Sequence, residues 1–239
     1  TMGLKIGSTS IGTLYLGATR IHEAYLGSVK LFESDWIDPN PLNLPAYTMR
    51  FQFGDSSYDP TQDTWNSGST WTQVSSSPNV WDYTNSDNSW GNAFKDKFTS
   101  SSNNVDVLGA NFSGITQAYS LFQNCSALKH VVYFDTSSTT NILYMFRSSG
   151  VVSIPSYNLS KVTSLDNLCA GCSSLTSIGM LNPSRVTSFK HAFLGCSSLT
   201  TIGPIDMSSA TDITGVFQAC TSLVNAPVIT TSNSLTYTA

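Results

Sequence analysis

The stretch Val186 to Ser208, VTSFKHAFLGCSSLTTIGPIDMS, decides the fold, because its pattern returns along the C-terminal half of the chain. The copy before it, Val162 to Ser184, is VTSLDNLCAGCSSLTSIGMLNPS. Three slots recur in register, 23 or 24 residues apart. The first slot holds Phe122, Phe146, Phe193 and Phe217, the second holds Cys125, Cys172, Cys196 and Cys220, and the third holds Leu128, Leu175, Leu199 and Leu223.

The copies differ at a few positions. Cys169 stands in the first slot of the third copy, and the second copy has Ser149 and Val152 in the other two slots. An Asp or Asn two residues before a Ser also recurs, at Asp135, Asn158, Asn182 and Asp206. A degraded earlier copy is expected to begin near Phe98.

Fixed spacing over five copies, with ordered apolar slots, is typical of a repeat protein. We therefore expect an α/β repeat solenoid of the leucine-rich-repeat type. Each turn should carry a short strand after the Leu slot, and a short helix or irregular return ending at the Phe slot. Equivalent residues would then stack about 4.8 Å apart, which makes the three slots into internal ladders.

The five cysteines fit this interpretation better than a metal or redox site. Cys169-Ala-Gly-Cys172 is formally a C-x-x-C motif, but both residues fall on repeat slots. A zinc site needs a second ligand pair, and the histidines His22, His130 and His191 show no ligand spacing. We predict buried structural thiols, with no metal and no cofactor.

Composition limits the classes of partner. Charged residues are 11% of the 239 residues and the net charge is −4, so no basic patch is available for nucleic acid or an anionic membrane. No apolar run approaches the roughly 20 residues of a membrane helix. Met2 is followed by patterned sequence rather than by a charged and then apolar leader, which favours a protein outside the general secretion route.

Residues 4–33 form three decamers, LKIGSTSIGT, LYLGATRIHE and AYLGSVKLFE. Each has an apolar residue followed by Gly, a pattern typical of a strand, turn and strand. The positions are Ile6, Gly7, Leu16, Gly17, Leu26 and Gly27. We predict a β-rich docking segment at 1–33, and a small β-meander that caps the next domain is the alternative.

Residues 34–97 are expected to be a linker and a Trp-rich β cap, before a solenoid at 98–239. Trp65, Trp71, Trp81 and Trp90 could form a sugar-stacking surface, but Trp is usually well buried, which favours the cap. Asp55, Asp59 and Asp63 do not match a calcium-loop spacing and are interpreted as turn residues.

The quoted repeats resemble the BspA-like leucine-rich repeat family, and the resemblance covers about 98–239. It implies surface display and adhesion to host proteins or other cells. The decamers, together with Val80-Trp81-Asp82-Tyr83 and Trp90, make residues 3–97 similar to the front ends of bacteriophage tail, baseplate or head-fibre proteins from gut-commensal hosts.

The expected function is that of a non-enzymatic bacteriophage virion protein, a head or tail decoration or fibre. It would join other virion proteins through residues 1–33 and attach by its solenoid to a host-surface protein or glycan, as a homo-oligomer. It would bind no nucleic acid and insert into no membrane. A bacterial cell-surface BspA-like adhesin is the alternative, and an enzyme acting on surface glycans is a more distant one.

Overall fold

The computed structural model describes residues 42–63, 65, 68–99, 103–179, 181–203 and 205–224, together with the backbone of four strands between 14 and 33. The chain divides into two units, 1–38 and 39–239. In the first unit, β1 (Leu14–Leu16) pairs antiparallel with β2 (Thr19–Ile21), and β3 (Glu23–Leu26) with β4 (Val29–Glu33). Leu16 and Leu26 end β1 and β3, whereas Ile6, Gly7, Gly17 and Gly27 lie outside the described residues.

The second unit opens with a five-stranded mixed sheet in the order β6-β7-β5-β8-β9. All pairs are antiparallel except β8 with β9, which are parallel. The strands are β5 (Thr48–Phe53), β6 (Thr70–Ser76), β7 (Asn79–Thr84), β8 (Val105–Asn111) and β9 (Leu128–Val131), with the 3-10 helix η1 (Pro60–Gln62) between β5 and β6. Because β9 belongs to the first full repeat, this sheet runs directly into the repeats.

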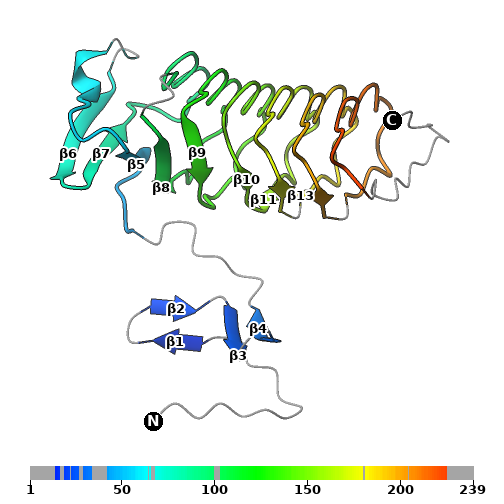
Figure 1. The fold of residues 1–239 in the computed structure, drawn as a ribbon, viewed down its shortest axis with the longest axis horizontal. Helices are drawn as coiled ribbons and strands as arrows, with labels where there is room; N and C mark the ends of the chain where they lie inside the picture. Colours follow the sequence, from blue (N-terminus) through cyan, green and yellow to red (C-terminus); the bar gives the residue numbers. More distant parts are fainter. Residues whose placement is uncertain are drawn as a thin grey trace. The chain divides into compact units, whose positions relative to one another are not determined.

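The repeats form coils that follow one another along one direction (Figure 1). Short parallel strands join them in two rows: β10 (Ser153–Ile154), β12 (Ser177–Ile178) and β14 (Thr201–Ile202) form one, and β11 (Tyr157–Asn158) and β13 (Leu181–Asn182) form the other. Single bridges add a third row at residues 89, 117 and 141, and at 164, 188 and 212.

The prediction of an α/β solenoid is wrong, because the described residues contain no α-helix and are nearly all β or turn. None of them therefore forms a helix that could cross a membrane. The segment expected to be helical shows why. Phe189, His191 and Phe193 donate their N–H to the next coil, while Ala192, Leu194 and Cys196 donate to the carbonyl three residues back. An α-helix needs every N–H to bond four residues back in its own segment, so these alternating donors exclude it.

The backbone φ angles also exclude a helix at the Phe slots. His191 and Gly195, two residues before and after the Phe193 slot, have φ of 55° and 71°. The equivalent pairs also have positive φ: Asn92 and Asp96, Ser120 and Asn124, Tyr144 and Ser148, Asn167 and Gly171, and Gly215 and Ala219. Left-handed residues interrupt a right-handed helix.

The interior of the coils is filled by the sequence ladders. The Phe-slot residues Phe122, Phe146, Cys169, Phe193 and Phe217 are at most 1% exposed. Phe122 and Phe146 stack with ring centroids 5.6 Å apart, and Phe193 and Phe217 at 5.4 Å. Cys125, Cys172, Cys196, Leu128, Leu175 and Leu199 are fully buried, while Cys220 and Leu223 are partly buried against the same core.

The structure corrects two of the repeat positions expected from the sequence. Val151, not Val152, occupies the Leu slot of the second copy: Val151 is 0% exposed, and the Val152 N–H bonds to the Lys129 carbonyl. Gly150 makes this possible, since a Cβ there would lie 2.0 Å from the Ser126 carbonyl oxygen. The earlier copy begins before Phe98, because Phe94 stacks on Phe122 at 5.5 Å and 11°.

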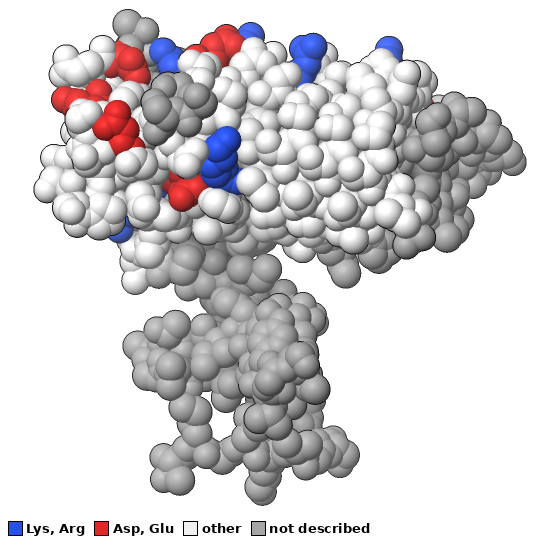
Figure 2. All heavy atoms as spheres, viewed as in Figure 1, with Lys and Arg blue, Asp and Glu red and all other residues white. Residues whose placement is uncertain are grey.

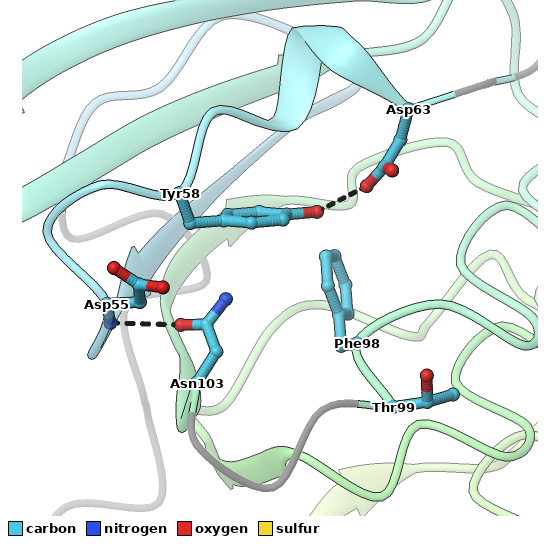
Figure 3. Close-up of a pocket in the computed structure, with 6 residues that line it drawn as sticks. All are labelled: Asp55, Tyr58, Asp63, Phe98, Thr99 and Asn103. Atoms are coloured by element: carbon cyan, nitrogen blue, oxygen red, sulfur yellow. Dashed lines mark hydrogen bonds between the residues drawn. The ribbon is translucent and has the colours of Figure 1, made fainter.

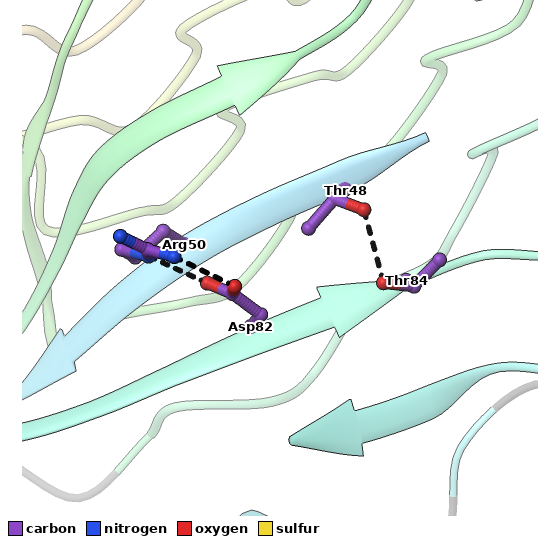
Figure 4. Close-up of polar contacts among 4 residues, drawn as sticks. All are labelled: Thr48, Arg50, Asp82 and Thr84. Atoms are coloured by element: carbon purple, nitrogen blue, oxygen red, sulfur yellow. Dashed lines mark hydrogen bonds and ion pairs between the residues drawn. The ribbon is translucent and has the colours of Figure 1, made fainter. Parts of the chain in front are cut away.

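The outer face of the mixed sheet carries a charged pair between neighbouring strands (Figure 4). Arg50 on β5 donates from Nε and Nη2 to the two carboxylate oxygens of Asp82 on β7, at 2.7 and 2.8 Å. Two residue pairs along, the hydroxyls of Thr48 and Thr84 are 3.0 Å apart. The bidentate pair raises the pKa of Arg50, first through the Asp82 hydrogen bonds. These contacts help to fix the β5–β7 register.

Candidate binding face of the repeats

One exposed row of threonines runs across five successive coils. It consists of Thr116, Thr140, Thr163, Thr187 and Thr211, and all but the half-buried Thr116 are exposed. The hydroxyl of Thr187 donates to the Thr163 carbonyl at 3.3 Å, and that of Thr211 donates to the Thr187 carbonyl at 3.1 Å. Each of these carbonyls also accepts the N–H of the same donor residue. The hydroxyl proton is thereby directed into the stack, which leaves the methyl group and the oxygen lone pairs facing outward.

A half-buried polar row adjoins the threonines and carries the parallel bridges. Its members are Gln117, Asn141, Ser164, Ser188 and Asp212. The Gln117 amide donates to the Thr140 hydroxyl at 3.3 Å, and the Ser188 hydroxyl donates to Asp166. We call these two rows together the threonine face.

Charge is sparse over the coils. In the view of Figure 2 the repeats are covered mostly by uncharged residues, and acidic side chains gather over the end of the unit that carries β6, β7 and η1. Asp212 is the one charged member of the threonine face, so a partner that meets this face has few charges to desolvate, which lowers the cost of burying it.

The recurring Asp or Asn before Ser closes a turn at the coil corners. Asp135, Asn158 and Asp206 accept the N–H of the Ser two residues later, at 2.8, 3.1 and 2.9 Å. These are Asx-turns, in which a short side chain replaces a backbone carbonyl. The hydroxyl and N–H of Ser208 hold the pKa of Asp206 below its ordinary value. The motif therefore forms turns of the coils, and its residues are not part of the threonine face.

The five cysteines are all free, and all but the partly buried Cys220 are buried inside the stack. Their thiols donate to carbonyls of the preceding coil: Cys125 to Phe94 at 2.9 Å, Cys172 to Phe146 at 2.8 Å, Cys196 to Cys169 at 3.2 Å, and Cys220 to Phe193 at 3.1 Å. Burial raises the pKa of the Cys125 and Cys169 thiols, so both stay protonated near neutral pH.

The four tryptophans belong to the aromatic cluster between the mixed sheet and the first coil. Trp81 and Trp90 are 8% and 0% exposed, and Trp65 and Trp71 are partly buried against the same core. The Trp65 and Trp71 rings lie 5.0 Å apart, and the Trp65 N–H donates to the Pro60 carbonyl at 2.6 Å. The indoles thus mainly close the core at the first coil.

The turn carboxylates serve local backbone groups. Asp55 accepts the N–H and hydroxyl of Ser57 at 2.8 and 2.7 Å, and Asp59 accepts those of Thr61 at 2.9 and 2.6 Å. Within the described part of the chain, no group of three His, Cys, Asp or Glu is arranged to hold a metal ion.

The threonine row was missed in the sequence, although a signal for it was present. The quoted copies both begin Val-Thr-Ser, and the Thr recurs with the same spacing as the apolar slots. The apolar slots predict the core, and the recurring Asp or Asn before Ser predicts a turn, but neither points to a surface row. An outward residue with the same period is the corresponding signal for a surface.

A family model described as "Mycoplasma protein of unknown function, DUF285" matches residues 88–200 and 147–234. No curated protein and no solved structure gives a significant match. The matched region covers the repeats that carry the BspA-like resemblance and starts where the first coil starts. It does not reach the decamers, so the likeness of residues 3–97 to virion proteins gains no support from it. By its repeats, over more than half of its length, the chain belongs to the DUF285 family.

Proposed function

We propose that the chain is a non-enzymatic attachment protein, which presents the threonine face to a protein or glycan on a cell surface. The observation that carries this proposal is the uncharged row of five aligned threonines on the outside of a fully packed stack. Stacked repeats offer extended surfaces of this kind to their partners. The hydroxyl protons of Thr140, Thr187 and Thr211 are committed to carbonyls, so these residues offer oxygen acceptors and methyl groups, which suits a partner rich in N–H or O–H donors.

The proposed location is a bacteriophage particle, with residues 1–33 as the docking segment and several copies on each particle. The support is the sequence likeness of the decamers and the two antiparallel hairpins of the first unit. Many weak contacts along one face gain avidity when several copies act together.

A bacterial cell-surface adhesin is the second candidate, with the same face and the same kind of partner. The family match favours it, because the family is described from Mycoplasma proteins.

Electron cryomicroscopy of particles from a culture that produces the protein separates the two locations. The virion proposal expects density for the coils on the particle, and loss of that density when residues 1–33 are deleted. If particles lack the protein and fractionation finds it on cells, the adhesin replaces the virion protein. Protein found only in the cell interior would contradict both.

A further inference from the structure

A pocket of about 260 Å³ opens beside the loop that joins β5 to η1 (Figure 3), and none of its lining residues belongs to the threonine face. Its lining combines two aromatic rings with four polar side chains. The lining residues are Asp55, Tyr58, Asp63, Phe98, Thr99 and Asn103. The volume is just below the roughly 300–1,000 Å³ of pockets that hold drug-sized ligands, so it suits one small ring.

The loop is held in place by a buried amide beneath it. Asn79 on β7 is 2% exposed, and its Nδ2 donates to the carbonyls of Asp55 and Tyr58 at 3.0 and 2.8 Å. The Oδ1 of Asn79 accepts the indole Nε1–H of Trp81 at 2.7 Å. The indole Nε1–H of Trp65 donates to the Pro60 carbonyl and holds the following turn in place. The pocket wall is therefore preorganised, which reduces the entropy that binding must cost.

The polar groups are each oriented by one neighbour and keep an atom for a ligand. Asp63 accepts the Tyr58 hydroxyl at 2.5 Å on Oδ2, which leaves Oδ1. Asp55 uses Oδ1 for both bonds from Ser57, which leaves Oδ2. These hydrogen bonds lower the pKa of Asp55, so its carboxylate is ionised near neutral pH.

Asn103 gives the clearest indication of a ligand. It is 6% exposed, and its Oδ1 accepts the Asp55 N–H at 3.1 Å, which fixes the orientation of the amide. Its Nδ2 has no hydrogen-bond partner among the residues that the structure describes, and Figure 3 shows it turned toward the space between Tyr58 and Phe98. This amide group can therefore donate to an acceptor that a ligand supplies.

Two rings complete the pocket. Tyr58 packs on Phe53 with centroids 4.7 Å apart, and Phe98 packs on Phe53 at 5.6 Å. Both rings are thus extensions of the rigid aromatic core. Ring faces next to carboxylate acceptors and an amide donor match a sugar, which has C–H groups on its faces and hydroxyls at its rim.

We propose that this pocket binds one neutral sugar residue, such as the terminal hexose or N-acetylhexosamine of a glycan. Its hydroxyls donate to Asp55 and Asp63, one of its oxygens accepts from Asn103, and its ring lies against Tyr58 or Phe98. The two carboxylates repel uronic and sialic acids. The site is separate from the threonine face and goes beyond the proposed attachment function.

The test is titration of the full chain with methyl glycosides, followed by saturation-transfer and chemical-shift NMR. The panel contains neutral hexosides, N-acetylhexosaminides and methyl glucuronide. The expected result is a Kd in the millimolar range for at least one neutral glycoside and no binding of the glucuronide. If no neutral glycoside binds, or the glucuronide binds equally well, the proposal is wrong.

Two matched variants locate the binding. Asp63→Asn and Asp59→Asn each remove one carboxylate that flanks η1, but only Asp63 lines the pocket. Asn remains a good cap for η1 at position 59. Asp63→Asn should weaken binding at least about tenfold, as loss of a charged hydrogen-bond acceptor predicts, and Asp59→Asn less than about twofold. Equal effects of the two variants would contradict the assignment.

A third variant tests the orientation of Asp63. Tyr58→Phe keeps the ring and removes the hydroxyl that holds the carboxylate, so the Kd should rise by less than it does in Asp63→Asn. A Kd equal to that of the unaltered chain would rule out this orienting role. A charged substitution in the threonine face, Thr187→Glu, should leave glycoside binding unchanged, so failure of the pocket and failure of the attachment function are distinguishable.

Discussion

Val151 and Val152 are neighbours in sequence, but only Val151 faces the interior. Spacing alone assigns the Leu slot to Val152, because Val152 follows Leu128 by 24 residues and Phe146 by six, as Leu128 follows Phe122. One residue is missing between Ser149 and the slot, and Gly150 lets the backbone approach the Ser126 carbonyl closely enough to shorten the path. Period counting cannot detect such a shift, since both candidates are Val.

Replacing Val151 by Ala should therefore lower the free energy of unfolding by about 1.5 kcal/mol or more, at about 0.8 kcal/mol for each buried methylene-sized group plus the cavity. Val152→Ala is the matched control and should cost less than half as much. Urea denaturation followed by tryptophan fluorescence measures both. Equal losses of unfolding free energy in the two variants would contradict the assignment of Val151 to the Leu slot.

At the scale of the element, the ladders could be predicted from sequence, but the helix could not be excluded. The apolar slots determine what is buried, and they are compatible with any return segment that brings Phe193 back to the interior. The choice against helix depends on positive φ at residues such as His191, Ser148 and Ala219. Only some of these positions are Gly or Asn, so composition gives a weak signal.

The left-handed positions make a direct prediction. Gly195 has φ of 71°, and a Cβ there would meet its nearest atom, Gly171 Cα, at an ordinary 3.8 Å. Gly195→Ala should thus cost about 1 kcal/mol or more from backbone conformation alone. Ser148→Gly, at the equivalent position of another coil, should be neutral or stabilising. Thermal unfolding compares the two variants. A Gly195→Ala variant that is as stable as the unaltered chain would contradict the left-handed conformation of Gly195.

The Asx corners predict the response to acid. Hydrogen bonds from Ser208 lower the pKa of Asp206, and those from Thr214 lower the pKa of Asp212. A lowered folded pKa contributes stability above the unfolded value of 3.8, and this contribution is lost as pH falls through the folded pKa.

The variant with Asp206→Asn and Asp212→Asn should therefore lose less stability than the unaltered chain between about pH 5 and pH 2. Asn158 forms the same turn with an amide, so the corner geometry should survive the change. Urea midpoints measured across this pH range provide the comparison. Parallel curves would show that these carboxylates contribute nothing to acid sensitivity.

At the scale of the whole molecule, sequence predicted repeats, buried thiols and an aromatic segment before the first coil. Sequence did not predict the pocket beside the β5–η1 loop. Asp55, Asn79 and Asn103 are far apart in the chain, and they meet only because β5, β7 and the loop before β8 are brought together by the sheet. The threonine row was accessible to sequence, since its period equals that of the core.

Attachment through the threonine face is the central claim, and a matched pair of exposed threonines tests it. Thr187 and Thr200 each donate a hydroxyl to the equivalent threonine one coil earlier, at 3.3 and 3.2 Å, but Thr200 lies in a different row, with Thr176 and Val152.

The decisive measurement is flow cytometry of the fluorescently labelled full chain on a panel of bacterial and animal cells. Thr187→Glu should reduce cell binding at least about tenfold by placing a charge in the contact, while Thr200→Glu should bind as the unaltered chain does. Equal binding of all three proteins would contradict the threonine face as the attachment surface, as would binding of none of them to any cell.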